Sequence, residues 1–329
     1  CDWKAACAAE WITVSPKEGE AGESTLSVAV GPNTATESRT AEITVNNDTY
    51  GVYRKITVNQ KGDNRPVNPN DINIPDTKFK AYLIENFDTD GDGAISENEA
   101  KTVGKIEIGE KGIASLQGIE YFTALDTLDC NNNSLTSLDL SRNKALKYLK
   151  LTNNSLSSLD LSNNTALTHL YCSSNSLAAL DLSKNTVLQV LDCGHNNLTS
   201  IDASKNTALT YLVFNHNQIA GDIDVSMCSK LSVLYCDDNQ ITTVNVTGCT
   251  VLKHFDCSNN QLTSLDVEDC AALFNFSCKN NRIASLDLSN NTALTQADCT
   301  ENPLTCLYLK KGQTIRYLYY PETAQVVYK

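Results

Sequence analysis

A segment of 21 residues recurs along most of this chain, and this repeat limits the folds that the chain can adopt. Nine units match the template LxxLxCxxNxLxxLDLSxNTA, and only the unit that starts at Leu209 is longer, with 22 residues. One unit of this length cannot bury its leucines alone, so successive units must stack in a solenoid. The units begin at Leu125, Leu146, Leu167, Leu188, Leu209, Leu231, Leu252, Leu273 and Leu294.

Each repeat position has a predicted role. The first six positions alternate with a period of two, which predicts a short strand in parallel with its neighbours. Their leucines and cysteine point inward, the third and fifth residues point outward, and LDLS returns along the far side. The ninth residue is always Asn, whose amide we expect to bond the backbone of its own turn and of the next coil. These are Asn133, Asn154, Asn175, Asn196, Asn217, Asn239, Asn260, Asn281 and Asn302.

Both ends of the array need a cap. Residues 104–124 carry a distorted version of the pattern, residues 125–314 hold the nine repeats, and residues 315–329 keep Ile315 and Leu318 but lose the Asn and gain tyrosines. We therefore expect a curved solenoid with a parallel β-sheet on its concave face, closed by a cap at each end.

Cysteine occupies the sixth position in seven units. Leu151 and Phe214 take that position in the other two, so the cysteines are expected to be inert buried hydrophobes. Neighbouring coils lie within disulfide range, but parallel Cβ vectors disfavour the disulfide torsion, and no CxxC pair indicates a metal site. The column comprises Cys130, Cys172, Cys193, Cys236, Cys257, Cys278 and Cys299, and a second one comprises Cys228, Cys249 and Cys270.

The template is the leucine-rich-repeat signature, and with its cysteine column it resembles the repeats of internalin J-type surface adhesins over residues 125–314. The resemblance implies a leucine-rich-repeat solenoid, here residues 104–329, and a role in adhesion.

Residues 88–99 match the 12-residue EF-hand calcium loop. Three carboxylates stand at loop positions 1, 3 and 5, a glycine at position 6 and a glutamate at position 12. Hard oxygen ligands in this number suit Ca²⁺ better than Mg²⁺. The alternative is an acidic solvated turn. The expected ligands are Asp88, Asp90, Asp92, the Ala94 carbonyl, Ser96 and Glu99.

The flanks of the loop predict helices. Asp76 is expected to cap a helix over 76–87, and Ser96 with Glu99 forms a capping-box pattern for a short helix to about Val103. Residues 76–103 thus form a helical, EF-hand-like cap. Because sensor proteins pair two such loops, this single loop predicts a structural calcium ion and not a switch.

The first 62 residues have strand character. Strands are predicted at Trp11–Val14, Thr25–Val30, Ala41–Val45 and Tyr53–Val58, and this spacing favours a β-sandwich. The runs WITVSPKEGEAGESTLSVAV, RTAEITV and KITVNQKG resemble the BACON domain of Bacteroidetes, which implies an immunoglobulin-like sandwich over 1–62. Residues 63–75 are expected to be a linker because Asp63–Asn70 holds two prolines and no apolar pattern.

Cys1 admits two interpretations. It matches the acylated N-terminal cysteine of a mature lipoprotein, but the BACON-like sequence starts in mid-strand, which equally fits a trimmed or incomplete domain. A disulfide between Cys1 and Cys7 is left open.

Several function classes are excluded. The net charge of −13 leaves no basic stripe for nucleic acid. No apolar stretch reaches the ~18 residues of a membrane helix, so a membrane is expected only through a lipid anchor. No GxSxG, phosphate loop or HExxH motif occurs, so the chain is not expected to be an enzyme; a dispersed catalytic site is the weak alternative.

The outward strand positions are rich in aromatic and acidic residues, which favours a ligand-binding face. A structural preference of strands for tyrosine is the alternative. His195 and His216 lie one coil apart and could share a metal, but no third ligand is evident, so they are expected to be surface residues. The candidate binding residues are Tyr148, His169, Tyr171, Asp192, Tyr211, Tyr235, His254, Asp256 and, at a second position, Phe274.

These observations predict a multidomain, mainly β, monomeric protein that is exported to the bacterial cell surface or outer membrane, as a lipoprotein, with the periplasm as alternative. Its expected ligand is an extracellular glycan, mucin-like glycoprotein or protein. The resemblances imply the same, since BACON domains are thought to bind carbohydrate or mucin or to space modules. A non-catalytic accessory or spacer protein of a glycan-utilisation system is the second hypothesis.

Overall fold

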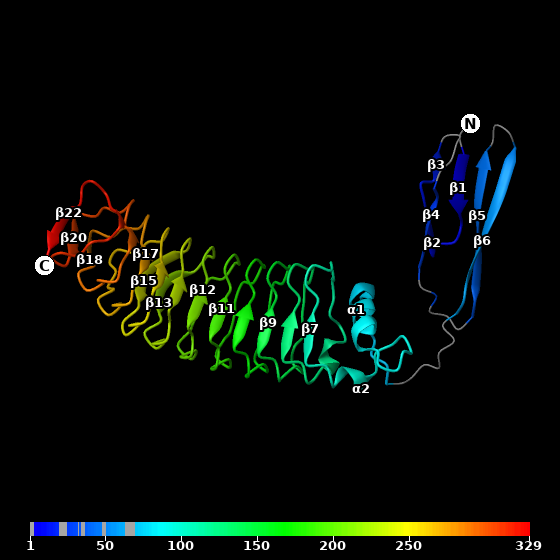
Figure 1. Ribbon diagram of the computed structural model, residues 1–329, viewed down its shortest axis with the longest axis horizontal. Helices are drawn as coiled ribbons and strands as arrows, with labels where there is room; N and C mark the ends of the chain where they lie inside the picture. The colour runs from blue at the N-terminus through cyan, green and yellow to red at the C-terminus, as the bar shows by residue number, and fades with distance from the viewer. Residues whose placement is uncertain (1–2, 20–24, 32, 34–36, 48–50, 63–69) are drawn as a thin grey trace. The chain divides into compact units, whose positions relative to one another are not determined.

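The computed structural model describes residues 3–19, 25–31, 33, 37–47, 51–62 and 70–329 (Figure 1). The chain forms two compact units, residues 1–69 and 70–329. Most of the predicted linker, Cys1 and hence the Cys1–Cys7 question lie outside the described residues.

The first unit consists of antiparallel strands. A four-stranded sheet has the order β3-β1-β5-β6, and β2 pairs with β4. Its buried core is small and comprises Ala5, Ile12, Val14 and Ile43. The residue pattern did not predict β1 and β3, because WKAAC is alanine-rich and β3 has two residues; a strand near Trp3 was expected only from the BACON resemblance. The strands are β1 Trp3–Cys7, β2 Ile12–Ser15, β3 Glu18–Gly19, β4 Ser27–Val30, β5 Arg39–Asn47 and β6 Val52–Gln60.

The second unit begins with two helices that share one core with the repeats. Helix α1 spans Thr77–Phe87 and buries Phe79 and Leu83 completely. Helix α2 spans only Glu97–Ala100 and not the stretch to Val103 that we predicted. The chain tightens there to i→i+3 hydrogen bonds, with Val103 N donating to Ala100 O at 3.2 Å.

Eleven short parallel strands form the sheet expected on the concave face, here called the long sheet. The nine repeats supply nine of them, and each cap adds one, so the predicted parallel solenoid is confirmed. The strands are β7 Lys105–Glu107, β8 Thr127–Asp129, β9 Tyr148–Lys150, β10 His169–Tyr171, β11 Val190–Asp192, β12 Tyr211–Val213, β14 Val233–Tyr235, β16 His254–Asp256, β17 Asn275–Ser277, β19 Gln296–Asp298 and β21 Tyr317–Tyr319, and the 3₁₀ turn η1 (Ile119–Tyr121) follows β7.

The returning segments form strands only in the later coils. One two-stranded and one three-stranded parallel sheet lie there, with the orders β13-β15 and β18-β20-β22. The strands are β13 Ala220–Asp224, β15 Gln240–Asn245, β18 Ser285–Asp287, β20 Cys306–Leu309 and β22 Gln325–Tyr328. Figure 1 shows the coils as a regular stack of turns with α1 beside the first of them.

The ninth-position asparagines hold adjacent coils together. Asn154 Nδ2 donates to Leu151 O at 2.9 Å and to Cys130 O at 3.1 Å, while its Oδ1 accepts from Leu135 N at 3.0 Å. The amide therefore bonds its own turn and the preceding coil, not the next coil as we predicted. The reason is that the Cys130 carbonyl and the Leu135 N–H both face the coil that follows them.

Two further positions of each turn carry a structural requirement. The eighth residue of all nine repeats has a positive φ, for example 52° at Asn132 and 51° at His216. Asparagine and aspartate tolerate this left-handed conformation better than most residues, which explains their frequency there. At the nineteenth position, buried Asn164 donates to Leu140 O at 3.1 Å and to Asn143 O at 2.9 Å.

Candidate functional site

Two columns of side chains project from the long sheet on the side that faces away from the core. In eight of the eleven strands, β8–β12, β14, β16 and β17, the middle residue is buried while the two flanking residues are half-buried, except for Val213, which is buried. In the third-position column, the strand register places Tyr148 beside His169, and Tyr211 follows two strands after His169. Eight of the nine predicted ligand residues lie in these columns, and Phe274, just before β17, is 48% exposed.

The aromatic residues on the early strands contact one another. The ring centroid of Tyr148 lies 5.6 Å from that of Tyr171 and 5.9 Å from that of His169. His254 and Phe274 form a second pair at 6.3 Å in edge-to-face geometry. Because these rings rise from backbone held on both sides by parallel pairing, they form rigid contact area, which costs little conformational entropy on binding.

Two of the predicted acidic ligand-binding residues also accept hydrogen bonds from the backbone of the turns that follow them. The Asp256 Oδ1 accepts from Ser258 N at 2.9 Å, and the Asp192 Oδ1 accepts from Gly194 N at 3.2 Å. The same bond recurs at Asp129 and Asp298, which were not predicted as ligands. A structural role in the turn therefore accounts for part of the aspartate frequency at the fifth position.

Burial shapes the electrostatics of the sheet surface. Burial, followed by nearby charged groups such as Asp192, raises the pKa of Tyr171 and of Tyr211. Both phenols therefore stay protonated at neutral pH and can donate a hydrogen bond to a ligand. Tyr235 and Asp256 line a hollow of about 140 Å³ further along the sheet, together with Asp237, Phe255, Asn275 and Ser277.

The predicted calcium loop brings three of its six expected ligands together. One oxygen from each of Asp88, Asp90 and Glu99 lies within 4.8 Å of the others. Asp88 shapes the turn, since its Oδ2 accepts from Gly93 N at 2.7 Å, and Gly93 has φ of 78°. A donor set of carboxylate oxygens fits Ca²⁺.

Glu99 is the most constrained of these carboxylates. It is only 8% exposed, and its oxygens accept from the N–H and hydroxyl of both Thr89 and Ser96, at 2.7–2.9 Å. Burial alone would raise its pKa, but these four donors outweigh burial and lower the pKa of Glu99 to about 2. Ser96 in turn caps α2 through Glu99 N, so ligand and helix cap are one unit.

The other three predicted ligands lie on the same loop. Asp92 Oδ1 accepts from Ala94 N at 2.7 Å, Ala94 is buried, and the Ser96 hydroxyl is engaged with Glu99. A short extended segment before α1 supports the loop, because Ile72 N donates to Ile95 O at 2.8 Å and Asp71 pairs with Ser96 in an antiparallel bridge.

Asp76 connects the helical cap to the first coil. Its Oδ1 accepts from the N–H groups of Lys78 and Phe79 as N-cap of α1, and its Oδ2 accepts from Ala114 N and Ser115 N. Burial by itself would raise the pKa of Asp76, and these four N–H donors outweigh it and hold the pKa below its ordinary value.

All cysteines in the described part of the chain are free thiols, and both predicted columns are buried. Burial raises the pKa of Cys228 and of Cys249 to about 11, and that of the sixth-position thiols Cys130 and Cys236 still further. Thiolate is the reactive form, so these residues are inert core groups in the folded protein.

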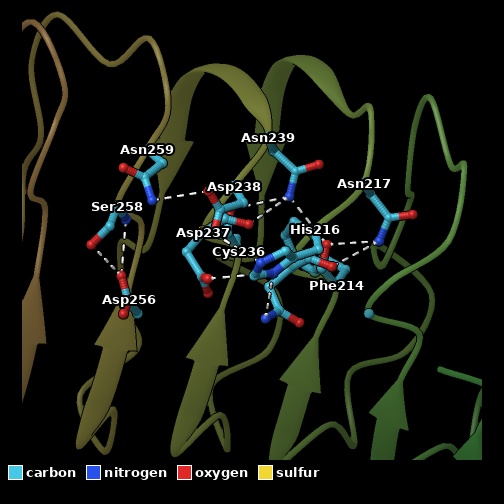
Figure 2. A network of polar contacts seen from close by, with 12 residues as sticks. Phe214, His216, Asn217, Cys236, Asp237, Asp238, Asn239, Asp256, Ser258 and Asn259 are labelled. Carbon is cyan, nitrogen blue, oxygen red and sulfur yellow. Dashed lines mark hydrogen bonds and ion pairs between the residues drawn. The ribbon is translucent and has the colours of Figure 1, made fainter. Parts of the chain in front are cut away.

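The histidine pair has neighbours that the sequence analysis missed. The rings of His195 and His216 stack with centroids 4.2 Å apart. On the next coil, Asp238 Oδ2 lies 3.2 Å from His216 Nε2, and Asp237 Oδ2 lies 3.8 Å from Nδ1 (Figure 2). The available signal was a repeat with carboxylates at both its seventh and eighth positions, directly after a repeat with histidine at its eighth.

Asp237 is unusual among the carboxylates at this end of the strands. Burial, reinforced by the Asp256 carboxylate on the next coil, raises the pKa of Asp237 to about 6. Its neighbour Asp238 accepts from Asn259 Nδ2 at 2.9 Å through the oxygen that does not face the histidine.

Comparison with known proteins finds similarities for both parts of the chain. Residues 2–61 match the BACON family, described as an N-terminal binding domain. Internalin J of Listeria monocytogenes is 35% identical over 70 residues, which are 21% of this chain and 8% of internalin J.

The solved functional domain of internalin J from the same organism, described as including a cysteine ladder, superposes with a TM-score of 0.63 and 32% identity and covers 77% of this chain and 59% of that one. A leucine-rich-repeat protein of Leptospira interrogans superposes with a TM-score of 0.57 at 22% identity, over 64% of this chain and 57% of that one. Internalin C2 of Listeria monocytogenes has a TM-score of 0.53 at 21% identity, over 69% of this chain and 94% of that one.

The last two structures support the fold alone. This chain spans 59% of the solved internalin J domain and less than a tenth of the curated protein. The matches indicate no catalytic family, and among the described residues no helix has the length and apolar character that crossing a bilayer requires. The chain therefore combines a segment that matches the BACON family, residues 2–61, with a leucine-rich-repeat solenoid that is similar to the one in internalin J.

Proposed function

We propose that this chain is an exported surface protein that binds a protein or glycoprotein ligand on the long sheet of its repeats. The observation that carries this proposal is the row of rigid, half-buried aromatic side chains with interspersed carboxylates along the strands. Tyrosine and histidine rings supply contact area, and the protonated phenols of Tyr171 and Tyr211 supply hydrogen-bond donors.

The similarity to internalin J and the BACON match support a binding role at the cell surface, and the proposed location is the bacterial surface or outer membrane, with the periplasm as alternative. A glycan is the second ligand class that this surface fits, because sugar rings stack on tyrosine in the same way as protein side chains do. We expect the protein to act as a monomer.

The proposed calcium ion has a structural role. Asp88, Asp90 and Glu99 would hold it with Asp92, the Ala94 carbonyl and Ser96, and the ion would neutralise the carboxylates gathered there. Because the loop packs through Ile95 into the core shared with the first coil, calcium would stabilise the start of the solenoid. Ligand recognition on the long sheet would then depend on calcium only through stability.

Binding of the full chain to arrays of extracellular proteins, intact mucins, deglycosylated mucins and free glycans tests the ligand face. Tyr171→Ala and Tyr211→Ala should each weaken the detected interaction at least ~10-fold if these residues are central contacts. Tyr328→Ala is the matched control, since Tyr328 is a 61% exposed tyrosine of β22 outside the long sheet. If both test variants retain every interaction, the long sheet is not the ligand face. Binding lost only after deglycosylation assigns the glycan as ligand.

Calorimetric titration with Ca²⁺ tests the loop. We expect one site in the parent chain, a large loss of affinity in Glu99→Gln, and no change in the control Glu97→Gln, whose carboxylate pairs with Lys101 at the surface. An absence of heat in the parent chain would end the calcium proposal without touching the ligand-face proposal.

A further inference from the structure

The turn that follows strand β14 differs in composition from the equivalent turn of every other repeat. The seventh and eighth positions are both carboxylates only in this coil, as Asp237 and Asp238. The coil before it has His216 at the eighth position. Stacking places the three residues at one spot, because His216 N donates to Asp237 O at 3.0 Å across the coils.

The three side chains converge. One ligand atom from each of His216, Asp237 and Asp238 lies within 4.8 Å of the other two. Two ligand atoms bound to one tetrahedral zinc ion at about 2.1 Å lie about 3.4 Å from each other. The 3.2 Å between His216 Nε2 and Asp238 Oδ2 agrees with such an edge. Asp237 Oδ2 lies 3.8 Å from Nδ1, the other ring nitrogen, so the Asp237 side chain has to turn toward Nε2 to bind the same ion.

We propose that His216, Asp237 and Asp238 form a binding site for a divalent transition-metal ion of the zinc class. An imidazole with two carboxylates suits zinc and its neighbours, whereas Ca²⁺ prefers an all-oxygen set. The His216 side chain is 45% exposed and that of Asp238 38%, so the fourth ligand position opens to solvent. A water molecule, or a donor atom of a ligand bound on the adjoining long sheet, can fill it.

The backbone around this site is fixed before any ion binds. Asn239 Nδ2 donates to the carbonyls of Phe214, Cys236 and Asp237 at 3.1–3.2 Å, which locks both coils at the turn (Figure 2). The Asn259 amide holds the outer oxygen of Asp238 and leaves the other oxygen directed at His216. Such outer partners orient metal ligands and raise affinity.

Asn215 and His195 complete the surroundings of the imidazole. The Asn215 Nδ2 atom lies 3.1 Å from His216 Nδ1; because Nδ1 carries the ring proton when Nε2 binds a metal, the amide has to turn its oxygen toward Nδ1 to accept that proton. The His195 ring is inclined by only 25° to that of His216 and stacks on it. Ions are bound in the plane of an imidazole ring, so two stacked rings do not share one ion, and His195 restrains His216 without being a ligand.

The competing interpretation is a protonated His216 that forms ion pairs with the two carboxylates. Titration of the full chain with ZnCl₂ in saturating CaCl₂ separates the two, since calcium then occupies the loop of residues 88–99. Calorimetry should show one saturable zinc site. Among the side-chain nitrogen NMR signals of the four histidines, those of His216 should show the largest change in chemical shift when zinc is added.

Three variants define the result. His216→Asn, which suits the positive φ, and Asp238→Asn should each weaken zinc binding at least ~10-fold. The control His195→Asn should bind zinc within about 3-fold of the parent chain, because only a restraining contact is lost. Circular dichroism of each variant checks that the repeats remain folded.

The proposal fails if the parent chain shows no saturable zinc binding, or if His216→Asn binds zinc like the parent. It fails as well if His195→Asn loses binding to the same extent as His216→Asn, since the two histidines would then act together. Glu99→Gln should leave zinc binding unchanged, which keeps this test independent of the calcium proposal.

Discussion

The calcium loop and the turn cluster of His216, Asp237 and Asp238 are two candidate metal sites built in opposite ways. The loop collects its oxygen atoms from twelve consecutive residues, and its shape is set by bonds within those residues, such as Gly93 N to Asp88. The cluster collects its donors from two coils and depends on bonds between coils, such as those of Asn239. The loop could therefore be recognised from a sequence template, whereas the cluster exists only because the coils stack.

The two sites also differ in the state of their carboxylates. Four donors keep the pKa of Glu99 at about 2, so it is ionised under all ordinary conditions. Burial and Asp256 raise the pKa of Asp237 to about 6. Local hydrogen bonds thus stabilise the ionised form of Glu99 in the loop, whereas burial and a carboxylate on the next coil destabilise the ionised form of Asp237 in the cluster.

The largest expected effect comes from removing a bond between coils. Asn239→Ala leaves the Ile219 N–H without its partner and removes one of the two side-chain donors to each of the Phe214 and Cys236 carbonyls, which should lower the free energy of unfolding by roughly 2–4 kcal/mol. The same change should loosen the cluster and weaken zinc binding, and leave calcium binding to the loop unchanged.

Urea unfolding followed by far-ultraviolet circular dichroism measures this effect on the repeats. Both tryptophans, Trp3 and Trp11, lie in the first unit, so their fluorescence reports that unit separately. The exposed Asn290→Ala is the control and should change stability by no more than about 0.5 kcal/mol. Equal losses in the two variants would show that the asparagine bonds do not hold the coils together.

A smaller loss is expected at the junction beside the loop. Asp76→Ala removes the N-cap of α1 and the acceptor of Ala114 N and Ser115 N, which should cost roughly 1–3 kcal/mol. Hydrogen exchange of the Ala114 and Ser115 amides should accelerate in this variant. Zinc binding at the distant cluster should not change, and a change there would contradict the independence of the two sites.

The repeat period, the strand positions, the ninth-position asparagines and the caps could all be predicted, because one stacking unit has to satisfy the same burial in every copy. The direction of the Asn154 bonds could not, since the pattern does not say which coil leaves its backbone groups free. Strands β13 and β15 also escaped prediction, because the only signal was the replacement of template leucines by the β-branched residues isoleucine and valine, which the repeat pattern treats as equivalent.

The candidate sites follow the same division. The residues of the calcium loop are contiguous, so their spacing alone pointed to a metal ligand set. Asp237 and Asp238 stand 21 and 22 residues after His216, and each by itself satisfies the left-handed or polar preference of its turn. Their meeting becomes visible only when equivalent positions of adjacent repeats are compared.

The pH dependence of the junction is a still smaller effect. The folded-state pKa of Asp76 lies below its ordinary value of 3.8, so ionised Asp76 stabilises the fold above that pH. This contribution should disappear as the pH falls from 3.8 through the lowered pKa. The stability difference between the parent chain and Asp76→Asn, measured by urea unfolding at several pH values, should therefore shrink below pH 3.8. A difference that stays constant with pH would show that the Asp76 charge contributes nothing.

The smallest effect is expected at His195, the residue that links the turn cluster to the regular repeats. Asparagine occupies this eighth position in four other coils with φ of 52–56°, so His195→Asn should keep the backbone conformation and change stability by no more than about 0.5 kcal/mol. It removes only the ring that stacks on His216 at 4.2 Å. Thermal unfolding should therefore coincide with that of the parent chain. A marked loss of stability would mean that the stacked histidine rings, and not the hydrogen bonds of the ninth-position asparagines, hold these two coils together.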